Sequence, residues 1–429
     1  MTVLPRQLEI ERLGQRGEGI AHGKKGPIYV PYALAGETVL ADVAGERGEL
    51  VEILKPSPDR IAAFCPHYGI CGGCAVQALS PSAYEDWKRN LLVNALQHTG
   101  VATDVGALVD AHGTGRRRAT FHARFDASGK AGTKTQVGFM KARAHDVVML
   151  ESCPILAPQM AGALPAARAI AEVLQAAKKP LDILVTATLS GLDIDIKGYG
   201  PLTSALVDAL IRAAETHDLA RLSNHGVLVI ERRAPILRMG KAEVAPPPGA
   251  FLQATEAGEA ALAGAVISAF AGAHRGLDLF AGVGTFSLRL AEAAQVHAVD
   301  SDALALTALL RAARDRPDLR PVTVETRDLF RRPVSGPELA AYDAAIFDPP
   351  RAGAEAQARA LAASTVPLIA AVSCNPSSFA RDMAVLKSGG YEIKSVIPFD
   401  QFRHSPHVES VAILRKLARK PRRNRRLLS

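Results

Sequence analysis

The stretch "LDLFAGVGTFSLRLA", residues 277–291, decides the fold of this 429-residue chain. Residues typical of a buried strand end at Phe280, a turn with Gly282 and Gly284 follows, and the next apolar residues indicate a helix. Glycine in such a turn lets the backbone approach a ligand closely. Ser287 stands where the dinucleotide fingerprint G-x-G-x-x-G has its third glycine, so the stretch departs from that fingerprint.

From residue 251 onward, short apolar strands alternate with helical stretches, which predicts an α/β fold with a doubly wound parallel sheet. Ligands of such sheets bind outside the carboxyl ends of the strands. The last connection, residues 400–408, is too short for a crossover helix, so we expect an antiparallel final strand that starts on the same edge. The residues expected at this edge are Phe280, Asp300, Asp328, Asp348, Cys374 and Glu409.

Two acidic residues frame the glycine turn: Asp278 lies before it and Asp300 ends the next strand. An acid at that strand end can accept hydrogen bonds from both ribose hydroxyls of a nucleoside. The strand, the turn and the two acids resemble class I S-adenosylmethionine (SAM) methyltransferases. The alternative is a purely structural glycine turn in another α/β enzyme.

Two motifs at the predicted edge indicate the reaction. "DPPRAG" resembles the D/N-P-P-Y motif of amine-directed methyltransferases, but Arg351 replaces the aromatic residue, and Cys374 follows one strand later. An amine needs no protein nucleophile, whereas C5 of uracil becomes nucleophilic only after a thiolate adds to C6. The motifs therefore favour methylation of a pyrimidine carbon, with Glu409 as the base for the C5 proton. The alternatives are a cysteine that fills the core and a solvated glutamate.

The thiol of Cys374 needs activation, because a free cysteine has a pKa of about 8.5 and is only a few per cent thiolate at pH 7. A depressed pKa, or proton removal concerted with the attack, would supply the thiolate. Asp348 is expected to hold the amide edge of uracil or to take part in this proton transfer.

Taken together, these motifs resemble one family. "SCNPSSFARD", "DPPRAG" and "HVES", with "FLQ", "LFAGVGTF" and "VDSD", are similar to the RNA uracil-C5 methyltransferase family, and the similarity covers nearly the whole chain. It implies SAM as methyl donor, Cys374 as nucleophile and Glu409 as base. Thr285 stands where relatives often carry Asn. The residues implied to lie at or near the cofactor are Gln253, Phe280, Gly282, Gly284, Thr285, Asp300, Asp328 and Asp348.

The chain divides into four predicted segments. Residues 1–58 alternate apolar and polar residues between glycines, which predicts a small OB-like β-barrel that resembles the RNA-binding TRAM domain. Residues 59–245 read as a central α+β domain, 246–415 as the methyltransferase domain, and 416–429 as a basic tail.

Four further cysteines form a pattern typical of a metal site. "CPHYGICGGC" contributes Cys65, Cys71 and Cys74, and "ESCPIL" contributes Cys153. Four thiolates suit a tetrahedral zinc or an iron–sulfur cluster, and the spacing alone does not choose between them. The family resemblance implies a [4Fe–4S] cluster with a structural role, with zinc as the alternative. Unligated buried thiols are the other interpretation.

The charge distribution indicates a nucleic-acid partner. The net charge is +8, but residues 415–429 hold eight Lys and Arg and no acid, so the rest of the chain balances at 43 of each sign. A local basic segment is typical of an RNA-binding arm, and "GRRRAT", residues 115–120, adds to this interpretation. The start lacks the layout of a signal peptide and no run approaches the roughly 20 apolar residues of a membrane span, so we expect a cytoplasmic protein. Nothing indicates an obligate protein partner.

The resemblance implies RNA as the substrate, with 23S ribosomal RNA ahead of transfer RNA. A stacked base cannot enter a buried cofactor crevice, so the target uridine must be single-stranded or flipped out. Two functions of other classes remain open: an amine-directed nucleic-acid methyltransferase that does not use Cys374, and a non-catalytic RNA-binding protein.

Overall fold

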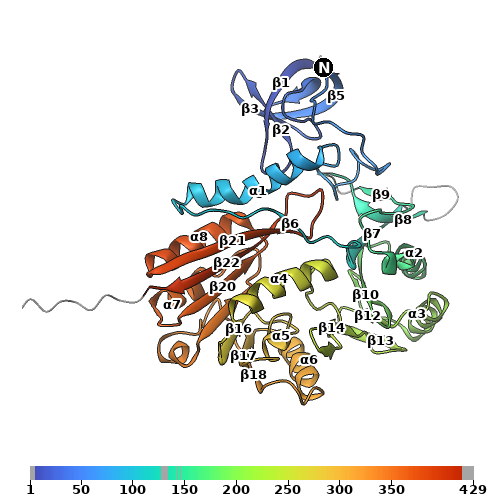
Figure 1. Ribbon diagram of the computed structural model, residues 1–429. Coiled ribbons are helices and arrows are strands. Elements are labelled where there is room, and N and C mark those ends of the chain that lie inside the picture. Colours follow the sequence, from blue (N-terminus) through green and yellow to red (C-terminus); the bar gives the residue numbers. More distant parts are fainter. Residues whose placement is uncertain (1–4, 127–133, 143, 145, 418–429) are drawn as a thin grey trace, which may run out of the picture.

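The computed structural model describes residues 5–126, 134–142, 144 and 146–417. A small barrel, a seven-stranded sheet and an eight-stranded sheet organise this part of the chain (Figure 1). No helix within the described ranges is long and apolar enough to cross a bilayer. Most of the predicted basic tail, from residue 418 on, lies outside the described residues.

The N-terminal strands close into a five-stranded barrel in the order β1-β2-β3-β5-β4. Alternate side chains point inward, so Ile10, Val30, Val39 and Ala41 form its apolar core. The small barrel expected from the period-two pattern is thus confirmed, whereas its assignment as a TRAM domain stays a prediction. The strands are β1 (Arg6–Leu13), β2 (Gly19–Gly23), β3 (Gly26–Val30), β4 (Thr38–Ala44) and β5 (Arg47–Lys55).

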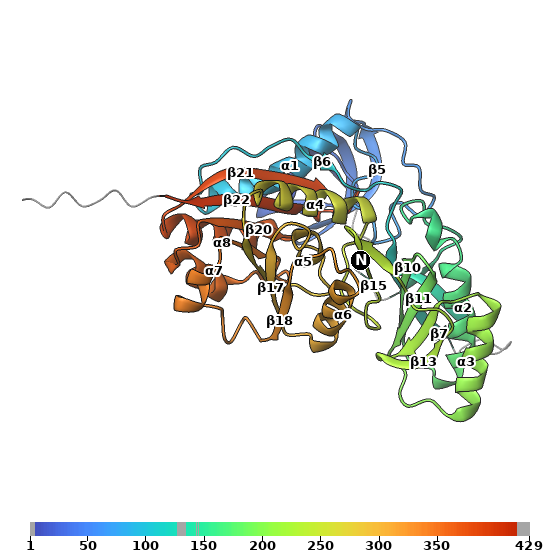
Figure 2. The ribbon, with the colours of Figure 1, turned by 60° about the horizontal axis from the view of Figure 1, so that its bottom comes forward.

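The seven-stranded sheet has the order β13-β12-β11-β10-β7-β8-β9. Two helices, α2 (Ala163–Leu174) and α3 (Ser204–Thr216), cover its outer face, away from the eight-stranded sheet (Figure 2). Ile170 and Leu174 of α2 are fully buried in the core with Val185. The strands are β7 (Arg118–Asp126), β8 (Lys134–Met140), β9 (Val147–Met149), β10 (Leu181–Thr188), β11 (Gly191–Lys197), β12 (Arg221–Asn224) and β13 (Val227–Glu231).

The eight-stranded sheet has the order β18-β17-β16-β19-β20-β22-β21-β6. The strands β16 to β20 pair in parallel, and β22 pairs antiparallel with β20, which confirms the expected antiparallel final strand. This is the class I methyltransferase arrangement predicted from the glycine turn. The strands are β6 (Val109–Asp110), β16 (Arg275–Leu279), β17 (Gln295–Asp300), β18 (Val322–Thr326), β19 (Ala344–Phe347), β20 (Leu368–Ser373), β21 (Tyr391–Asp400) and β22 (Glu409–Lys416).

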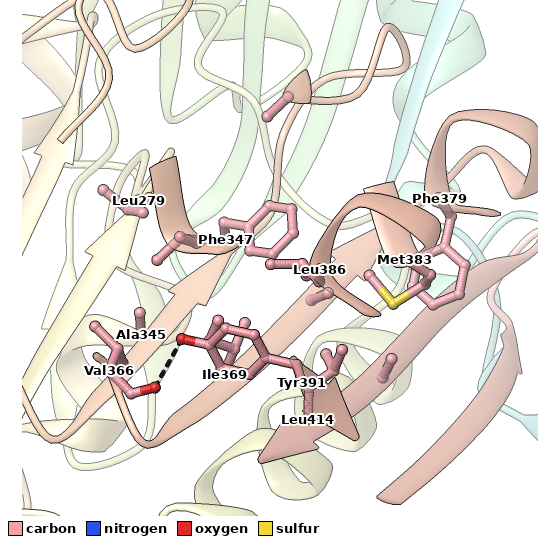
Figure 3. Packing of buried hydrophobic residues seen from close by; sticks show 14 of the residues in the cluster. Leu279, Ala345, Phe347, Val366, Ile369, Phe379, Met383, Leu386, Tyr391 and Leu414 are labelled. Carbon is pink, nitrogen blue, oxygen red and sulfur yellow. Dashed lines mark hydrogen bonds between the residues drawn. The ribbon is translucent and has the colours of Figure 1, made fainter. Parts of the chain in front are cut away.

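Helices bury both faces of this sheet. On one face α1, α7 and α8 share a core in which Phe347, Ile369, Leu386 and Tyr391 interdigitate, and the Tyr391 hydroxyl donates to the Val366 carbonyl at 2.7 Å (Figure 3). On the other face, side chains of α4 and α5 pack against the strands. The helices are α1 (Pro81–His98), α4 (Glu256–Ala269), α5 (Ser287–Leu290), α6 (Ala303–Arg314), α7 (Glu355–Ala363) and α8 (Pro376–Ser388).

Part of the predicted central segment belongs to the methyltransferase sheet instead. Leu92 and Leu96 of α1 lie in the same core as Phe379 of α8, and β6 pairs in parallel with β21. Lys88 of α1 is fully buried and its Nζ lies 2.5 Å from Asp400, the last residue of β21. The sequence did not indicate this arrangement, because α1 and β6 pair with elements roughly 300 residues later and such tertiary contacts do not show in the local composition. A two-stranded sheet, β14 (Leu237–Met239) with β15 (Ala242–Val244), follows the central sheet in the sequence.

Candidate active site

A cavity of about 810 Å³ lies at the carboxyl edge of the eight-stranded sheet. Several predicted edge residues sit one or two positions beyond their strands, because the chain has already left the sheet where it faces the cavity. The predicted residues that line the cavity are Gln253, Phe280, Gly282, Asp300, Asp328, Asp348, Cys374 and Glu409.

Two predicted cofactor residues do not line this cavity. Gly284 faces helix α6, where an added Cβ would lie 2.8 Å from Leu309, so this glycine serves close packing. Thr285 presents its carbonyl to Arg289, whose Nη1 donates to it at 2.7 Å. Within the glycine turn, Gly282 and Val283 line the cavity, whereas Gly284 and Thr285 contact the neighbouring helices.

Two backbone amides, one of them in the glycine turn, hold the Asp300 carboxylate by its two oxygens. The Gly282 amide donates to one oxygen at 2.9 Å and the Asp302 amide to the other at 2.8 Å. A carboxylate offers about four lone-pair sites, so Asp300 can still accept from hydroxyls of a ligand. Phe280 has a positive φ of 64°, a strained conformation that ends β16 sharply and turns its ring toward Phe330, with ring centroids 5.5 Å apart.

Asp278 has a structural rather than a ligand-facing position. It is fully buried, and the Ser287 hydroxyl donates to its Oδ2 at 2.5 Å. Burial raises the pKa of Asp278 to about 7. Ser287, which occupies the third position of the glycine pattern, therefore ties the start of α5 to β16.

Asp348 follows β19 and precedes two prolines that stiffen the turn. Its Oδ2 accepts from Gln253 Nε2 at 3.2 Å. Burial, with the charges of Glu409 and Asp278, raises the pKa of Asp348 well above its ordinary value. The neutral acid is therefore favoured at Asp348 more than it is at an exposed aspartate.

Cys374 lies between β20 and α8, immediately before the residue that caps the helix. The Asn375 side chain accepts from the Ser377 amide at 3.0 Å and donates to the Arg351 carbonyl at 3.0 Å, so it fixes both the helix start and the turn after Asp348. Burial raises the pKa of Cys374 to about 11, with Glu409 and Asp348 adding to the shift and Arg351 opposing it. The resting thiol is thus neutral, which favours proton removal at the moment of attack over a preformed thiolate.

Glu409 is the first residue of β22 and is only 3 % exposed. Burial raises its pKa to about 7, while a hydrogen bond from Gln401 and the charges of Arg351 and Lys88 oppose the shift. A carboxyl group with this pKa exchanges protons readily near neutral pH, which is what a general base requires.

The seven-stranded sheet contributes a basic wall to the same cavity. Arg116, Arg118 and Lys197 all line it. The middle arginine of "GRRRAT" behaves differently: Arg117 is buried and its Nη2 lies 2.5 Å from Glu259 of α4. Two of the three arginines therefore face the cavity, and the third connects the central sheet to the methyltransferase domain.

Other cavity residues carry no sequence motif. Phe402, in the loop between β21 and β22, lies under the Arg116 guanidinium at 5.1 Å and edge-on to His407 at 5.7 Å. Gln401, in the same loop, is almost fully buried beside the cavity. A single residue after a strand gives no sign in the sequence of what it will contact. Reasoning from motifs therefore missed both Gln401 and Phe402.

The four predicted cluster cysteines, Cys65, Cys71, Cys74 and Cys153, line a second cavity of about 210 Å³. Burial raises the pKa of Cys74 to about 11 and also raises the pKa of Cys71 and Cys153. Within the described ranges, no three His, Cys, Asp or Glu side chains are grouped closely enough to hold a single metal ion. The thiols thus share a chamber without forming a compact one-ion site.

Comparison with known proteins identifies the family of the chain. A family model described as tRNA (Uracil-5-)-methyltransferase matches residues 319–417. An uncharacterized RNA methyltransferase of Brucella suis is 43 % identical over 410 residues, covering 96 % of this chain and 98 % of the relative. The 23S rRNA (uracil(1939)-C(5))-methyltransferase RlmD of Chromohalobacter salexigens is 33 % identical, covering 95 % of this chain and 88 % of the relative.

A solved structure shares the fold. The tRNA (uracil-54, C5)-methyltransferase of Pyrococcus abyssi, in complex with S-adenosyl-L-homocysteine, superposes with a TM-score of 0.70 at 22 % identity, covering 95 % of this chain and 99 % of the other. The fold and the relatives define a SAM-dependent RNA methyltransferase. More narrowly, the chain belongs to the RNA uracil-C5 methyltransferase family.

Proposed function

We propose that this enzyme methylates C5 of a uridine in 23S ribosomal RNA through a covalent bond between Cys374 and C6 of the base. The observation that carries the proposal is the meeting of Cys374, Glu409 and Asp348 in one cavity, close enough for the two carboxylates to raise the pKa of the thiol. A thiol beside a carboxyl group with a pKa of about 7 provides both the nucleophile and the base that this reaction needs.

The first step forms the covalent bond. The Sγ–H bond of Cys374 breaks, its proton passes to solvent, and the sulfur bonds to C6. The electron pair of the C5–C6 double bond moves toward the carbonyl at C4, which gives an enolate. SAM supplies the methyl group that C5 then takes up.

The second step restores the C5–C6 double bond of the uracil ring. Glu409 removes the C5 proton, the electron pair of the C5–H bond re-forms the double bond, and the C6–S bond breaks with its pair returning to Cys374. The methyl group replaces one hydrogen, so each turnover releases one proton to solvent. The raised pKa of Asp348 suits a neutral acid that donates to the uracil carbonyl and so stabilises the enolate.

Cofactor binding is assigned to the other half of the cavity. The Asp300 carboxylate, held by two backbone amides, accepts from the ribose hydroxyls, and Gly282 allows the backbone to approach the ligand. Phe280 and Asp328 line the same region. The basic wall of Arg116, Arg118 and Lys197 then faces the RNA phosphates around the flipped uridine.

The methylation activity of the Cys374→Ala variant tests the covalent route directly. RNA that carries the target uridine, SAM and the Cys374→Ala variant should give no methylated RNA, while the variant still binds SAM. Methylation that survives this substitution would refute the covalent route and support an amine-directed enzyme. RNA binding without any methylation by the unmodified chain would support the non-catalytic alternative.

The RNA class is supported by the name of the Chromohalobacter relative, which specifies 23S rRNA. Mass mapping of 5-methyluridine in ribosomal and transfer RNA from cells that lack the gene separates the two classes. Loss from a 23S fragment is expected, and loss from the transfer RNA T-loop alone would replace ribosomal RNA with transfer RNA as the substrate.

For the cysteine chamber we propose a [4Fe–4S] cluster held by Cys65, Cys71, Cys74 and Cys153. Four thiols that line one chamber supply the donor set that such a cluster takes, and zinc on the same four thiols is the alternative. Such a cluster would hold the loop of residues 65–74, and the next residue, Ala75, donates from its amide to the His404 carbonyl at 2.7 Å. Iron and inorganic sulfide in the anaerobically purified protein are expected, and zinc in their place would refute the cluster.

A further inference from the structure

Gln401 occupies the centre of a buried hydrogen-bond network beside the proposed base. It follows β21 directly and is 1 % exposed. Its Nε2 lies 3.0 Å from Glu409 Oε1 and 2.6 Å from Gln253 Oε1. One side chain thus touches both the proposed base and the glutamine that contacts Asp348.

The backbone fixes the orientation of the Gln401 amide. Its Oε1 accepts from the Ala254 amide at 2.9 Å and from the Thr255 amide at 3.4 Å. Backbone amides can only donate, so the carbonyl oxygen must face them and the NH₂ group must face the two side chains. The two hydrogens of the NH₂ group match its two acceptors.

This orientation sets the direction of every hydrogen bond that follows. Gln253 accepts from Gln401 at Oε1, so its own Nε2 donates to Asp348 Oδ2 at 3.2 Å. Glu409 accepts at Oε1, and the hydrogen bond makes that oxygen the less basic of the two, so Oε2 is the preferred site for a proton. The proton taken from C5 therefore goes to Glu409 Oε2.

We propose that Gln401 is a positioning residue that keeps Glu409 oriented and ionised as the base for the C5 proton. The inference rests on the function proposed above. In the step that it supports, the C5–H bond breaks, the proton bonds to Oε2, and the electron pair expels the Cys374 thiolate from C6. Gln401 does not touch the reacting atoms; it stabilises the form of Glu409 that can accept.

Other charged groups face Glu409 from neighbouring elements. Arg351, after β19, and Lys88 of α1 favour the anion, although Lys88 is already paired with Asp400 of β21. Asp348 and Cys374 would oppose it if they were ionised, but both have raised pKa values. Among the described residues, Gln401 is the side chain that donates a hydrogen bond to this carboxylate.

The Gln401→Met variant tests the proposal, because methionine keeps the length and burial but cannot donate. Loss of a hydrogen bond to a charged group should raise the pKa of Glu409, so the rising limb of the pH profile of kcat should move up by about one pH unit or more. At neutral pH the covalent protein–RNA adduct should accumulate on a denaturing gel, and it should decline as the pH is raised. KM for RNA should stay within a few-fold.

The matched control is Gln357→Met. Gln357 is also a buried glutamine that bonds the backbone, through Val334 N and O at 2.9 Å each, but it lies in α7 outside the cavity. Its pH profile should equal that of the unmodified enzyme. SAM binding reports whether each variant is folded; if Gln401→Met fails to bind SAM, Gln401→Glu should show the same upward shift, because its carboxylate repels that of Glu409.

An unchanged pH profile in a folded Gln401 variant would overturn the inference, as would equal shifts in the Gln357 control. The unmodified enzyme separates this outcome from failure of the proposed function. If it forms no Cys374-dependent adduct with RNA under any condition, the covalent route itself fails. If it does and the Gln401 variants behave like it, only the role of Gln401 fails.

Discussion

The reactivity of Cys374 should depend on the carboxylate beside it. A pKa of about 11 leaves about one thiol in ten thousand ionised at pH 7, against about 3 % for a free cysteine with a pKa of about 8.5. The full shift corresponds to alkylation about 300 times slower than that of a free thiol. Because the thiol is partly accessible to solvent, screening reduces this contrast, and we expect at least a tenfold slower reaction.

Iodoacetamide and peptide mass spectrometry measure this rate at one cysteine. Trypsin releases Cys374 in the peptide of residues 360–381, which contains no other cysteine. The rate should be low at pH 7 and rise toward pH 11. In Glu409→Gln, the neighbouring negative charge is gone, so the rate above pH 7 should increase severalfold at each pH.

The control is Glu392→Gln, which removes an exposed glutamate that pairs with Lys394 on β21. It should leave the alkylation rate of Cys374 unchanged. Reaction of the unmodified enzyme at pH 7 as fast as a free cysteine would refute the neutral-thiol reasoning, and would point to a preformed thiolate.

Three further outcomes follow from the same structure. Glu409→Gln should trap a covalent protein–RNA adduct that carries the methyl group, and a denaturing gel with only free RNA would argue against Glu409 as the base. Lys88→Ala should lower the free energy of unfolding by about 3–5 kcal/mol in urea titrations, because the Asp400 carboxylate is left buried without its counterion. The control Lys394→Ala removes an exposed lysine and should change the free energy of unfolding by about 1 kcal/mol or less. Similar values for the two variants would contradict the burial argument. Deletion of residues 418–429 should make RNA affinity less dependent on salt. The slope of log affinity against log salt concentration should become shallower by about 0.7 for each phosphate that the tail no longer neutralises. An unchanged slope would exclude the tail from RNA binding.

The sequence predicted which residues meet at the carboxyl edge of the sheet, because that edge follows from topology. Once strands are recognised as parallel, their carboxyl ends must meet, and this rule alone brought Asp300, Asp348 and Cys374 to one cavity. The short final connection was enough to place Glu409 beside them, since only an antiparallel strand can follow so short a link.

The sequence failed where a role depends on a distant partner. Lys88 reads as an ordinary surface lysine of an amphipathic helix, yet it is fully buried against Asp400. Gln401 has no motif, and its contacts come from residues about 150 positions earlier. Gly284 was assigned to the cofactor from the glycine turn and Thr285 from the family resemblance; neither lines the cavity, and their contact with the cofactor stays a prediction.

The pairing of β6 with β21 also limits how this enzyme can be divided. A fragment that starts at residue 246 keeps every motif of the reaction but loses α1 and β6. One edge of β21 then lacks its hydrogen-bonded neighbour, and Asp400 lacks its counterion. An exposed edge strand can pair with a strand of another chain, so such a fragment should self-associate, and light scattering would detect this. The catalytic unit is thus assembled from two separated stretches of the polypeptide, and excising it as one continuous piece should yield an aggregate instead of a smaller enzyme.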